Sequence, residues 1–309
     1  MYQPGDENLW LRQTLERLVL DAPENRLADF GGQTIYDAPL VGVADGDDVA
    51  FEAFRTAVSG RHLMPREVLA QHAPPEADLC RVRVAAWAMP FTAPIRRANR
   101  GQSWPARLYS AARNNGGALV FRVAQRLVEL LRRRGCAAVA PVLTDAYDAF
   151  RSPEHTFASS WSERHVAWAA GLGLFGLTNA LITARGIHVR FGSVVTNLAV
   201  EPTPRAGDEW RAPCRASAGA LCGRCIARCP VGAISSEGLD KEKCYAMRRA
   251  IRERCMEDYA RTLHLLHAPI ATSGRKRSGY SLGCALCHSG VPCESRMPAF
   301  AQSEAAAHA

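Results

Sequence analysis

Apolar positions recur at helical spacing near the start and near the middle of the chain. Residues 8–20 (NLWLRQTLERLVL) place five leucines close to the helical period, which predicts a first helix. Residues 118–135 carry an apolar stripe that runs from Val120 to Leu131, then a basic last turn, and Gly135 at the stop. Basic residues and a glycine are typical of a helix C-terminus, so this segment predicts the clearest helix of the chain.

Two further apolar stretches have the pattern of strands. Residues 81–91 begin with alternation and become a continuous apolar run, which predicts a central strand closed by Pro90. Residues 136–143 predict a second buried strand, and residues 189–202 predict a strand pair broken at Gly192. Residues 25–60 contain many glycines and prolines, and we expect them to be rich in loops.

Helices and strands that follow one another in this way predict an α+β (α/β) fold. The segment 202–207 (PTPRAG) has the composition of a linker. We therefore expect a first domain over residues 1–205, a cysteine-rich domain over 206–300 and a frayed tail over 301–309.

Composition and charge leave this picture unchanged. The 309 residues are 48% hydrophobic and 22% charged, as in ordinary globular proteins. The longest apolar run, residues 166–177, is about half as long as a membrane span, and the first residues lack the pattern of a signal peptide. We expect a soluble, cytoplasmic protein that does not use a membrane. The net charge of +8 allows an anionic partner, but solvated basic faces are the favoured interpretation.

The cysteines carry the strongest chemical signal. Nine of the eleven lie between residues 214 and 293. The run Cys222-x2-Cys225-x3-Cys229-Pro230 matches the end of a bacterial ferredoxin motif, in which short spacings wrap a loop around an iron–sulfur cluster. A second group has the spacing Cys284-x2-Cys287-x5-Cys293.

Eight cysteines are enough for two [4Fe–4S] clusters, because each cluster needs four thiolates. The candidates are Cys214, Cys222, Cys225, Cys229, Cys244, Cys284, Cys287 and Cys293. Zinc is the main alternative, but paired CxxC motifs of zinc sites stand about 15–20 residues apart. The interval from Cys225 to Cys284 is far longer, and zinc would leave four cysteines unexplained. Cys80, Cys136 and Cys255 are expected to be ordinary side chains.

Four segments together resemble epoxyqueuosine reductase and its shorter relatives, which in turn resemble the iron–sulfur half of corrinoid reductive dehalogenases. These segments are residues 162–183, 189–198, 222–244 and 283–295. The resemblance runs from about residue 160 to residue 296. It implies a nitroreductase-like N-terminal domain that holds cobalamin, and a two-cluster ferredoxin-like module that supplies electrons.

The resemblance also implies how the cysteines divide. The first cluster would take Cys214, Cys222, Cys225 and Cys293, and the second would take Cys229, Cys244, Cys284 and Cys287. Two spacings depart from the family pattern, and Glu294 stands where the family has a proline.

In the family, a glycine-rich segment lines the corrinoid pocket, because glycine lets a flat macrocycle approach the backbone. The matching residues here are Ala170, Gly171, Leu172, Gly173, Phe175, Gly176, Thr178 and Asn179. The alternative is that this segment is a glycine-rich connection between a helix and a loop, with no ligand.

The proton donor of the family is missing. Leu108 stands where epoxyqueuosine reductases carry an aspartate, and residues 81–128 contain no Asp or Glu at all. Reduction of an epoxide still needs an acid. Tyr109 is the candidate, by similarity to the dehalogenases, and epoxyqueuosine itself is not the expected substrate.

Two functions are compatible with these observations. The first is an iron–sulfur and cobalamin-dependent reductase of an electrophilic substrate, either a small molecule or a tRNA-borne group. It would receive electrons from a reduced ferredoxin- or flavodoxin-type protein. The second is a non-catalytic iron–sulfur protein that carries electrons or activates a partner without a corrinoid. The size of the N-terminal domain favours the reductase.

Overall fold

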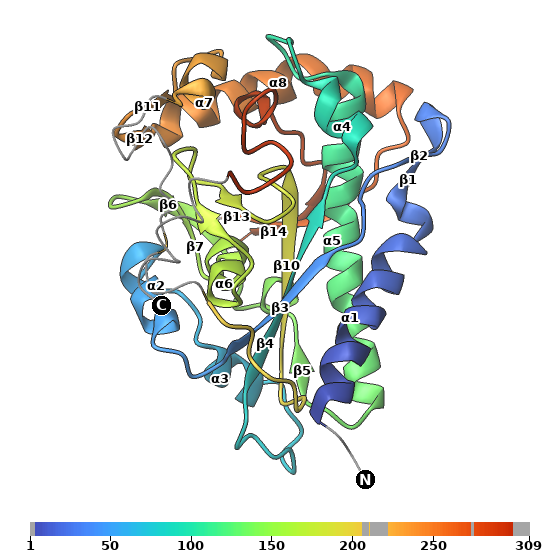
Figure 1. Ribbon diagram of the computed structural model, residues 1–309, viewed down its shortest axis with the longest axis vertical. Coiled ribbons are helices and arrows are strands. Elements are labelled where there is room, and N and C mark those ends of the chain that lie inside the picture. The colour runs from blue at the N-terminus through green and yellow to red at the C-terminus, as the bar shows by residue number, and fades with distance from the viewer. Residues whose placement is uncertain (1–3, 206–209, 211–221, 273–274, 299–309) are drawn as a thin grey trace.

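The computed structural model describes residues 4–205, 210, 222–272 and 275–298. A four-stranded sheet lies at its centre (Figure 1). The strands are β3 (Leu40–Asp45), β4 (Arg83–Pro90), β10 (Val189–Thr196) and β5 (Ala138–Val139), in the order β3-β4-β10-β5. All neighbours are antiparallel, so the fold is of the α+β kind rather than one built on a parallel sheet.

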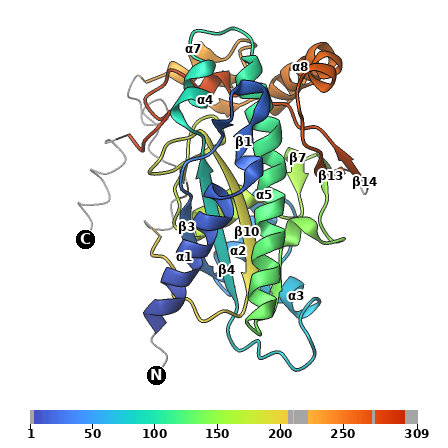
Figure 2. The same ribbon diagram turned by 90° about the vertical axis from the view of Figure 1, so that its right-hand side faces the viewer.

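Strand β4 is buried on both faces because helices cover each of them. Its successive side chains alternate between two hydrophobic clusters, as the period of two requires: Trp87 belongs to one cluster and Ala86 and Ala88 to the other. The first cluster includes α1 (Pro4–Leu20) and α5 (Arg107–Arg133), which lie side by side on one face (Figures 1 and 2). The second includes α2 (Ala50–Ala57), α3 (Pro65–Ala70) and α6 (Glu163–Ala169).

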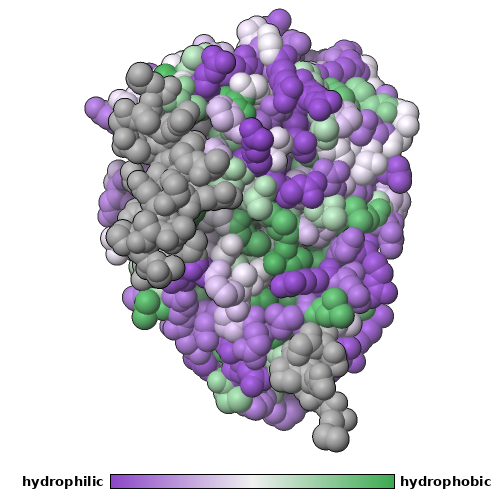
Figure 3. All heavy atoms as spheres, in the orientation of Figure 1, coloured by the Kyte–Doolittle hydropathy of each residue, from purple (hydrophilic) through white to green (hydrophobic). Residues whose placement is uncertain are grey.

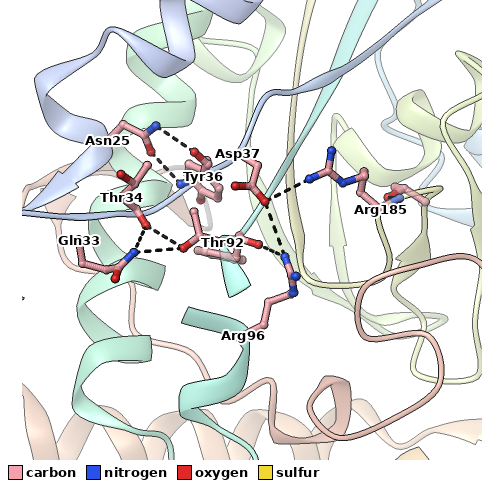
Figure 4. A network of polar contacts seen from close by, with 10 residues as sticks. Asn25, Gln33, Thr34, Tyr36, Asp37, Thr92, Arg96 and Arg185 are labelled. Atoms are coloured by element: carbon pink, nitrogen blue, oxygen red, sulfur yellow. Dashed lines mark hydrogen bonds and ion pairs between the residues drawn. The ribbon is translucent and has the colours of Figure 1, made fainter. Parts of the chain in front are cut away.

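Short elements connect these layers. They are η1 (Pro23–Asn25), β1 (Arg26–Leu27), η2 (Ala28–Phe30), β2 (Gln33–Thr34), α4 (Ala93–Ala98), η3 (Pro141–Leu143), β6 (Ala149–Ser152), β7 (Thr156–Ser159), β8 (Leu174–Phe175) and β9 (Leu181–Ile182). The β1–β2 region is fixed by a polar network (Figure 4). In this network the Asn25 side chain bonds both backbone groups of Tyr36, and Thr92 donates to the carbonyl of Thr34. This network holds Tyr36 against helix α5.

The cysteine-rich region packs on the same core. It contains α7 (Arg224–Arg228), β11 (Ile234–Ser235), β12 (Gly238–Leu239), α8 (Lys241–Thr262), β13 (Ala268–Thr272), β14 (Arg275–Gly279) and η4 (Leu286–His288). Met247, Ile251 and Tyr259 of α8 join the hydrophobic cluster of α1 and α5. Two hydrogen bonds fix the start of the expected linker: the N–H of Thr203 donates to the carbonyl of Val43 (2.8 Å), and the N–H of Val43 donates to Thr203 Oγ1 (3.0 Å).

Three sequence expectations about elements need correction. The long helix begins at Arg107 rather than at residue 118, because packing against the C-terminal region supports its polar first half. Strand β10 runs unbroken through Gly192, which faces Trp87 across the sheet; a Cβ there would lie 2.5 Å from the indole. Residues 25–60 contain β3 and α2 and are not mainly loop.

Over the described residues, no helix is long and apolar enough to cross a membrane. In the view of Figure 3, hydrophilic residues cover most of the described surface of this face, and a smaller hydrophobic group lies near its middle.

Candidate functional site: thiols and guanidiniums beside helix α5

Two asparagines in the middle of α5 attach the C-terminal region to this helix. The Asn114 amide donates to the carbonyl of Leu266 (2.9 Å), and its oxygen accepts from the backbone N–H of Ser281 (2.8 Å). The Asn115 amide donates to the carbonyl of His264 (2.9 Å), and its oxygen accepts from the N–H of Leu266 (2.9 Å). Both side chains are buried, so these four bonds fix the segment between α8 and the last cysteine group relative to α5.

The structure brings together Cys229, Cys244, Cys284 and Cys287, which we call the thiol group. They come from the end of α7, from α8 and from around η4. The other three thiols each raise the pKa of Cys287, beyond the larger effect of its burial. Burial raises the pKa of Cys284 to about 11, with smaller contributions from Cys244 and Cys229. These four are the residues expected to hold the second cluster.

Backbone contacts fix the position of the thiol group. The N–H of Ala233 donates to Cys229 Sγ (3.2 Å), a bond that tunes the potential of an iron–sulfur cluster when it reaches a ligand sulfur. The amide of Asn99 donates to the carbonyl of Cys284 (3.1 Å). Arg228 donates to the carbonyls of Ser289 (3.1 Å) and Asn99 (3.0 Å), which joins α7 to both loops.

The chemistry of the donor set fits an iron–sulfur cluster. Cluster ligands are thiolates, but burial and mutual repulsion raise the pKa values of Cys244, Cys284 and Cys287 and so favour their neutral form at neutral pH. A bound cationic metal centre supplies the charge that makes four adjacent thiolates stable. In the described ranges, no three His, Cys, Asp or Glu side chains are close enough to hold a single metal ion. A four-iron cluster is larger than one ion and keeps its sulfur ligands farther apart.

The other expected ligands are placed less closely. Cys225 is 8% exposed and contributes to the raised pKa of Cys287, while Cys222 and Cys293 are partly buried. The carbonyl of Cys293 accepts from the N–H of Ile187 (2.9 Å). Cys214 lies outside the described residues, so the first cluster stays a prediction.

The neighbouring positions have structural explanations. Glu294, which replaces the family's proline, is buried and forms an ion pair with Arg100 (2.7 Å). Cys255 is buried in the core and accepts a hydrogen bond from Trp104 Nε1 (3.4 Å). Cys80 is exposed.

Tyr109 lies next to the thiol group on α5. It is 2% exposed, and its ring centroid stands 5.8 Å from those of both Phe91 and His188. Burial raises its pKa to about 12, with smaller contributions from Cys284 and Cys287. The structure therefore places the expected proton donor close to the thiol group, in a position where the neutral phenol is strongly favoured.

One turn further along α5, Arg113 lies beside Arg190 of β10. A Cβ on Gly117 would stand 3.5 Å from Arg190 Nη2 and 3.7 Å from Arg113 Nη1, so both guanidiniums meet at this glycine. Arg113 Nη1 and Arg190 Nε are buried and have no hydrogen-bond partner within the described part of the chain. We call Arg113, Gly117, Tyr147, Glu163 and Arg190 the central site.

Glu163 is a functional candidate that sequence reasoning missed. Trp161 Nε1 donates to Ser193 Oγ (3.0 Å), and Ser193 Oγ donates to Glu163 Oε2 (2.7 Å). Burial raises the Glu163 pKa to about 8, against the smaller opposing effects of Ser193 and Arg190. Oε1 has no hydrogen-bond partner among the described residues. Glu163 lies outside residues 81–128, where the acid of the family was expected; a carboxyl at the start of an otherwise apolar segment was the available signal.

The glycine segment is folded against the protein itself. A Cβ on Gly173 would lie 2.2 Å from the carbonyl oxygen of Ile182, and one on Gly171 would lie 2.7 Å from that of Pro204. These glycines therefore serve close packing, which was the alternative interpretation of the segment. Its tip reaches the arginines: Arg164 donates to the carbonyl of Asn179, and the buried Thr178 hydroxyl has no partner in the described ranges.

The remaining expected cofactor residues follow the same hairpin. Ala170, Leu172 and Phe175 are buried in the second hydrophobic cluster, and Gly176 is packed against the side chain of Ile182. The unpartnered Thr178 hydroxyl makes the Thr178–Asn179 tip the best candidate in this segment for contact with a cofactor, and the role of the other positions stays a prediction.

The site thus consists of buried thiols on one side of α5 and a polar, arginine-rich centre beside them. No protein-family profile matches the chain, and no curated protein matches it. Solved structures do match. The chain resembles epoxyqueuosine reductase from Streptococcus thermophilus with 13% identity and a TM-score of 0.45, over 91% of this chain and 64% of that one.

Two further matches have the same character. An epoxyqueuosine reductase solved with an epoxyqueuosine-modified tRNA stem loop is 16% identical, with a TM-score of 0.41, and 77% of this chain is covered. The chain spans 57% of the length of that enzyme. A B12-dependent reductive dehalogenase is 16% identical, with a TM-score of 0.41 over 68% of this chain and 27% of that one. The two groups that the motifs resemble are thus the ones found in the structural comparison.

Proposed function

We propose that the chain is an iron–sulfur reductase of the epoxyqueuosine reductase type. In this proposal it passes electrons from two [4Fe–4S] clusters to an electrophilic substrate at the central site, with cobalamin as the second cofactor. The substrate is a small molecule or a group carried on tRNA, other than epoxyqueuosine. A reduced ferredoxin- or flavodoxin-type protein supplies the electrons.

The observation that carries the proposal is the position of Arg113 between the thiol group and the central site. A Cβ on Gly283, the residue before Cys284, would lie 3.1 Å from Arg113 Nε. The other end of the same side chain lies beside Arg190 in the central site. Arg113 therefore contacts both the residue beside Cys284 and the central site, which supports a short path for electrons between the thiol group and that site.

The protein's own residues have distinct tasks. The thiol group holds a cluster, which takes up and releases single electrons when bound. Asn114 and Asn115 keep that cluster at a fixed separation from the central site. Cobalamin, which the family resemblance implies, would supply a strongly reducing metal centre, and Thr178 and Asn179 are the residues that support its contact with this chain.

Glu163 is a better proton donor than Tyr109. A donor works best when its pKa lies near the working pH, because it then carries a proton and still gives it up readily. Glu163 has a pKa of about 8 and an unpartnered oxygen in the central site, whereas the pKa of the buried Tyr109 is about 12. This assignment replaces the carboxylic acid that is absent from residues 81–128.

Anaerobic purification followed by iron, sulfide and cobalt analysis tests the proposal. We expect about eight irons and eight sulfides per chain, a visible spectrum bleached by dithionite, and a changed corrinoid spectrum when cobalamin is added. Zinc in place of iron would refute the reductase. Eight irons with no corrinoid binding and no reductase activity would instead support the electron carrier.

A further inference from the structure

The central site contains an accumulation of positive charge that the fold does not neutralise. Arg113 of α5 and Arg190 of β10 meet at Gly117. Burial and the neighbouring Arg190 together lower the pKa of Arg113 to about 9. The exposed Arg248 of α8 adds a smaller effect of the same sign.

Arg113 and Arg190 lack the carboxylate partners that arginines inside a protein normally have. Elsewhere in the described chain arginines are commonly paired, as Arg134 is with Glu7 and Arg100 with Glu294. Among the ion pairs of the described residues, none includes Arg113 or Arg190. Glu163 is the nearby carboxyl group, but its raised pKa of about 8 leaves it mostly protonated at neutral pH. Buried charges without partners are costly, so this arrangement calls for an anion.

The site is also open to a ligand. Arg113 and Arg190 are each partly exposed, although one nitrogen of each is buried without a partner. Glycine at position 117 leaves room between the two guanidiniums that any other side chain would fill. A planar guanidinium matches the geometry of a carboxylate or a phosphate group, and two of them side by side provide several parallel donors.

We propose that Arg113 and Arg190 form a binding site for an oxyanion, a carboxylate or phosphate group, carried by the ligand that enters the central site. The proposal names the chemistry of the ligand and rests on the proposed reductase only for what happens to that ligand afterwards. The binding itself requires no reaction.

Isothermal titration of the purified, cluster-containing protein with inorganic phosphate and with acetate tests the site at physiological ionic strength. We expect saturable binding of at least one of the two, and tighter binding of phosphate identifies a phosphorylated ligand. Arg190→Gln is expected to weaken that binding by about ten- to a hundred-fold, as for loss of a charged hydrogen bond. Arg12→Gln is the matched control, because Arg12 is exposed on α1; its affinity should equal that of the wild type.

Gly117→Ala provides a second variant that should fold. Its methyl group would make ordinary contacts of 3.5 and 3.7 Å with the two guanidiniums. It would occupy the space that the anion needs, so we expect an affinity loss similar to that of Arg190→Gln. Absence of binding to both anions, or equal affinity in wild type and Arg190→Gln, overturns the proposal. Iron content measured on the same samples separates this result from failure of the reductase proposal.

Discussion

The thiol group and the central site present the same physical problem with opposite sign. In the thiol group, four partly buried acids would repel one another if they ionised, and the pKa values of Cys244, Cys284 and Cys287 are raised. In the central site, partly buried guanidiniums repel one another and the pKa of Arg113 is lowered. The thiols can avoid the repulsion by staying neutral, whereas arginine stays charged at neutral pH even with a pKa of about 9.

This difference indicates what each region binds. A set of thiols that becomes stable as thiolates only beside positive charge indicates a metal cluster, and a pair of permanent cations indicates an anion. Helix α5 borders both regions, so an electron donor and an anionic acceptor would lie on neighbouring turns of one rigid element. The following variants change one side of this comparison at a time.

The largest effect is expected from Cys284→Ser. Loss of one thiolate should release the second cluster, so the variant should contain about four fewer irons per chain and show about half the visible absorbance. Cys80→Ser, at an exposed cysteine outside the thiol group, is the control and should retain all the iron. Equal iron content in the two variants would exclude Cys284 as a ligand.

Glu163→Gln should change how stability depends on pH. Between pH 4.5 and about 8, folded wild-type protein keeps a proton on Glu163 that the unfolded chain releases. Wild-type stability therefore falls as pH rises through this window, by at most about 5 kcal/mol, and glutamine removes this loss. Urea unfolding at pH 5 and pH 8.5 measures the difference. Glu129→Gln, at an exposed carboxyl on α5, is the control for the change of charge; parallel profiles for wild type and Glu163→Gln would contradict the burial of this acid.

The same variant tests the proton donor. If Glu163 supplies the proton, wild-type activity should decline above pH 8 as the carboxyl ionises, and Glu163→Gln should be slower by about 100-fold or more. The pH–rate profile of reduction measures both effects. An unchanged rate would return Tyr109 to consideration as the donor.

Gly116→Ala should destabilise the fold by about 1–3 kcal/mol. The added methyl group would lie 2.2 Å from the Tyr36 hydroxyl oxygen, and Tyr36 is fixed by the Asn25 network and has no space to withdraw. Urea unfolding measures the loss. A stability equal to that of wild type would show that Tyr36 can move away from α5.

The smallest effect is expected at Gly117, the residue after Gly116 on α5. Gly117→Ala should stabilise the protein by about 0.5–1 kcal/mol, because alanine is a better helix former and meets only ordinary contacts here. Together with the Gly116 variant it forms a matched pair on adjacent residues of α5. Destabilisation by both substitutions would mean that the space beside the two guanidiniums is already filled.

The sequence predicted an element correctly where the pattern that defines it lies within one short segment. The leucine period predicted α1, and the apolar run ending at Pro90 predicted β4, which the structure confirms. The cysteine spacing selected eight candidate ligands, and the family resemblance implied which four of them the fold gathers into the thiol group. Gly192 was misinterpreted because its reason lies across the sheet, in the indole ring of Trp87. The polar first half of α5 was missed for the same reason, since its asparagines are satisfied by a segment about 150 residues away.

The sequence by itself determined which thiols lie close together within each short motif, because thiol spacing within a loop is a local property of the chain. It also determined the main secondary structure, which follows from local periodicity. Only the tertiary structure decided which charges meet. Arg113, Glu163 and Arg190 are far apart in sequence, and the pKa shifts of Arg113 and Glu163 depend on burial and on neighbours that the fold assembles from α5, α6 and β10. Local patterns cannot encode that electrostatic environment, which is why the acid and the anion site emerged from the structure.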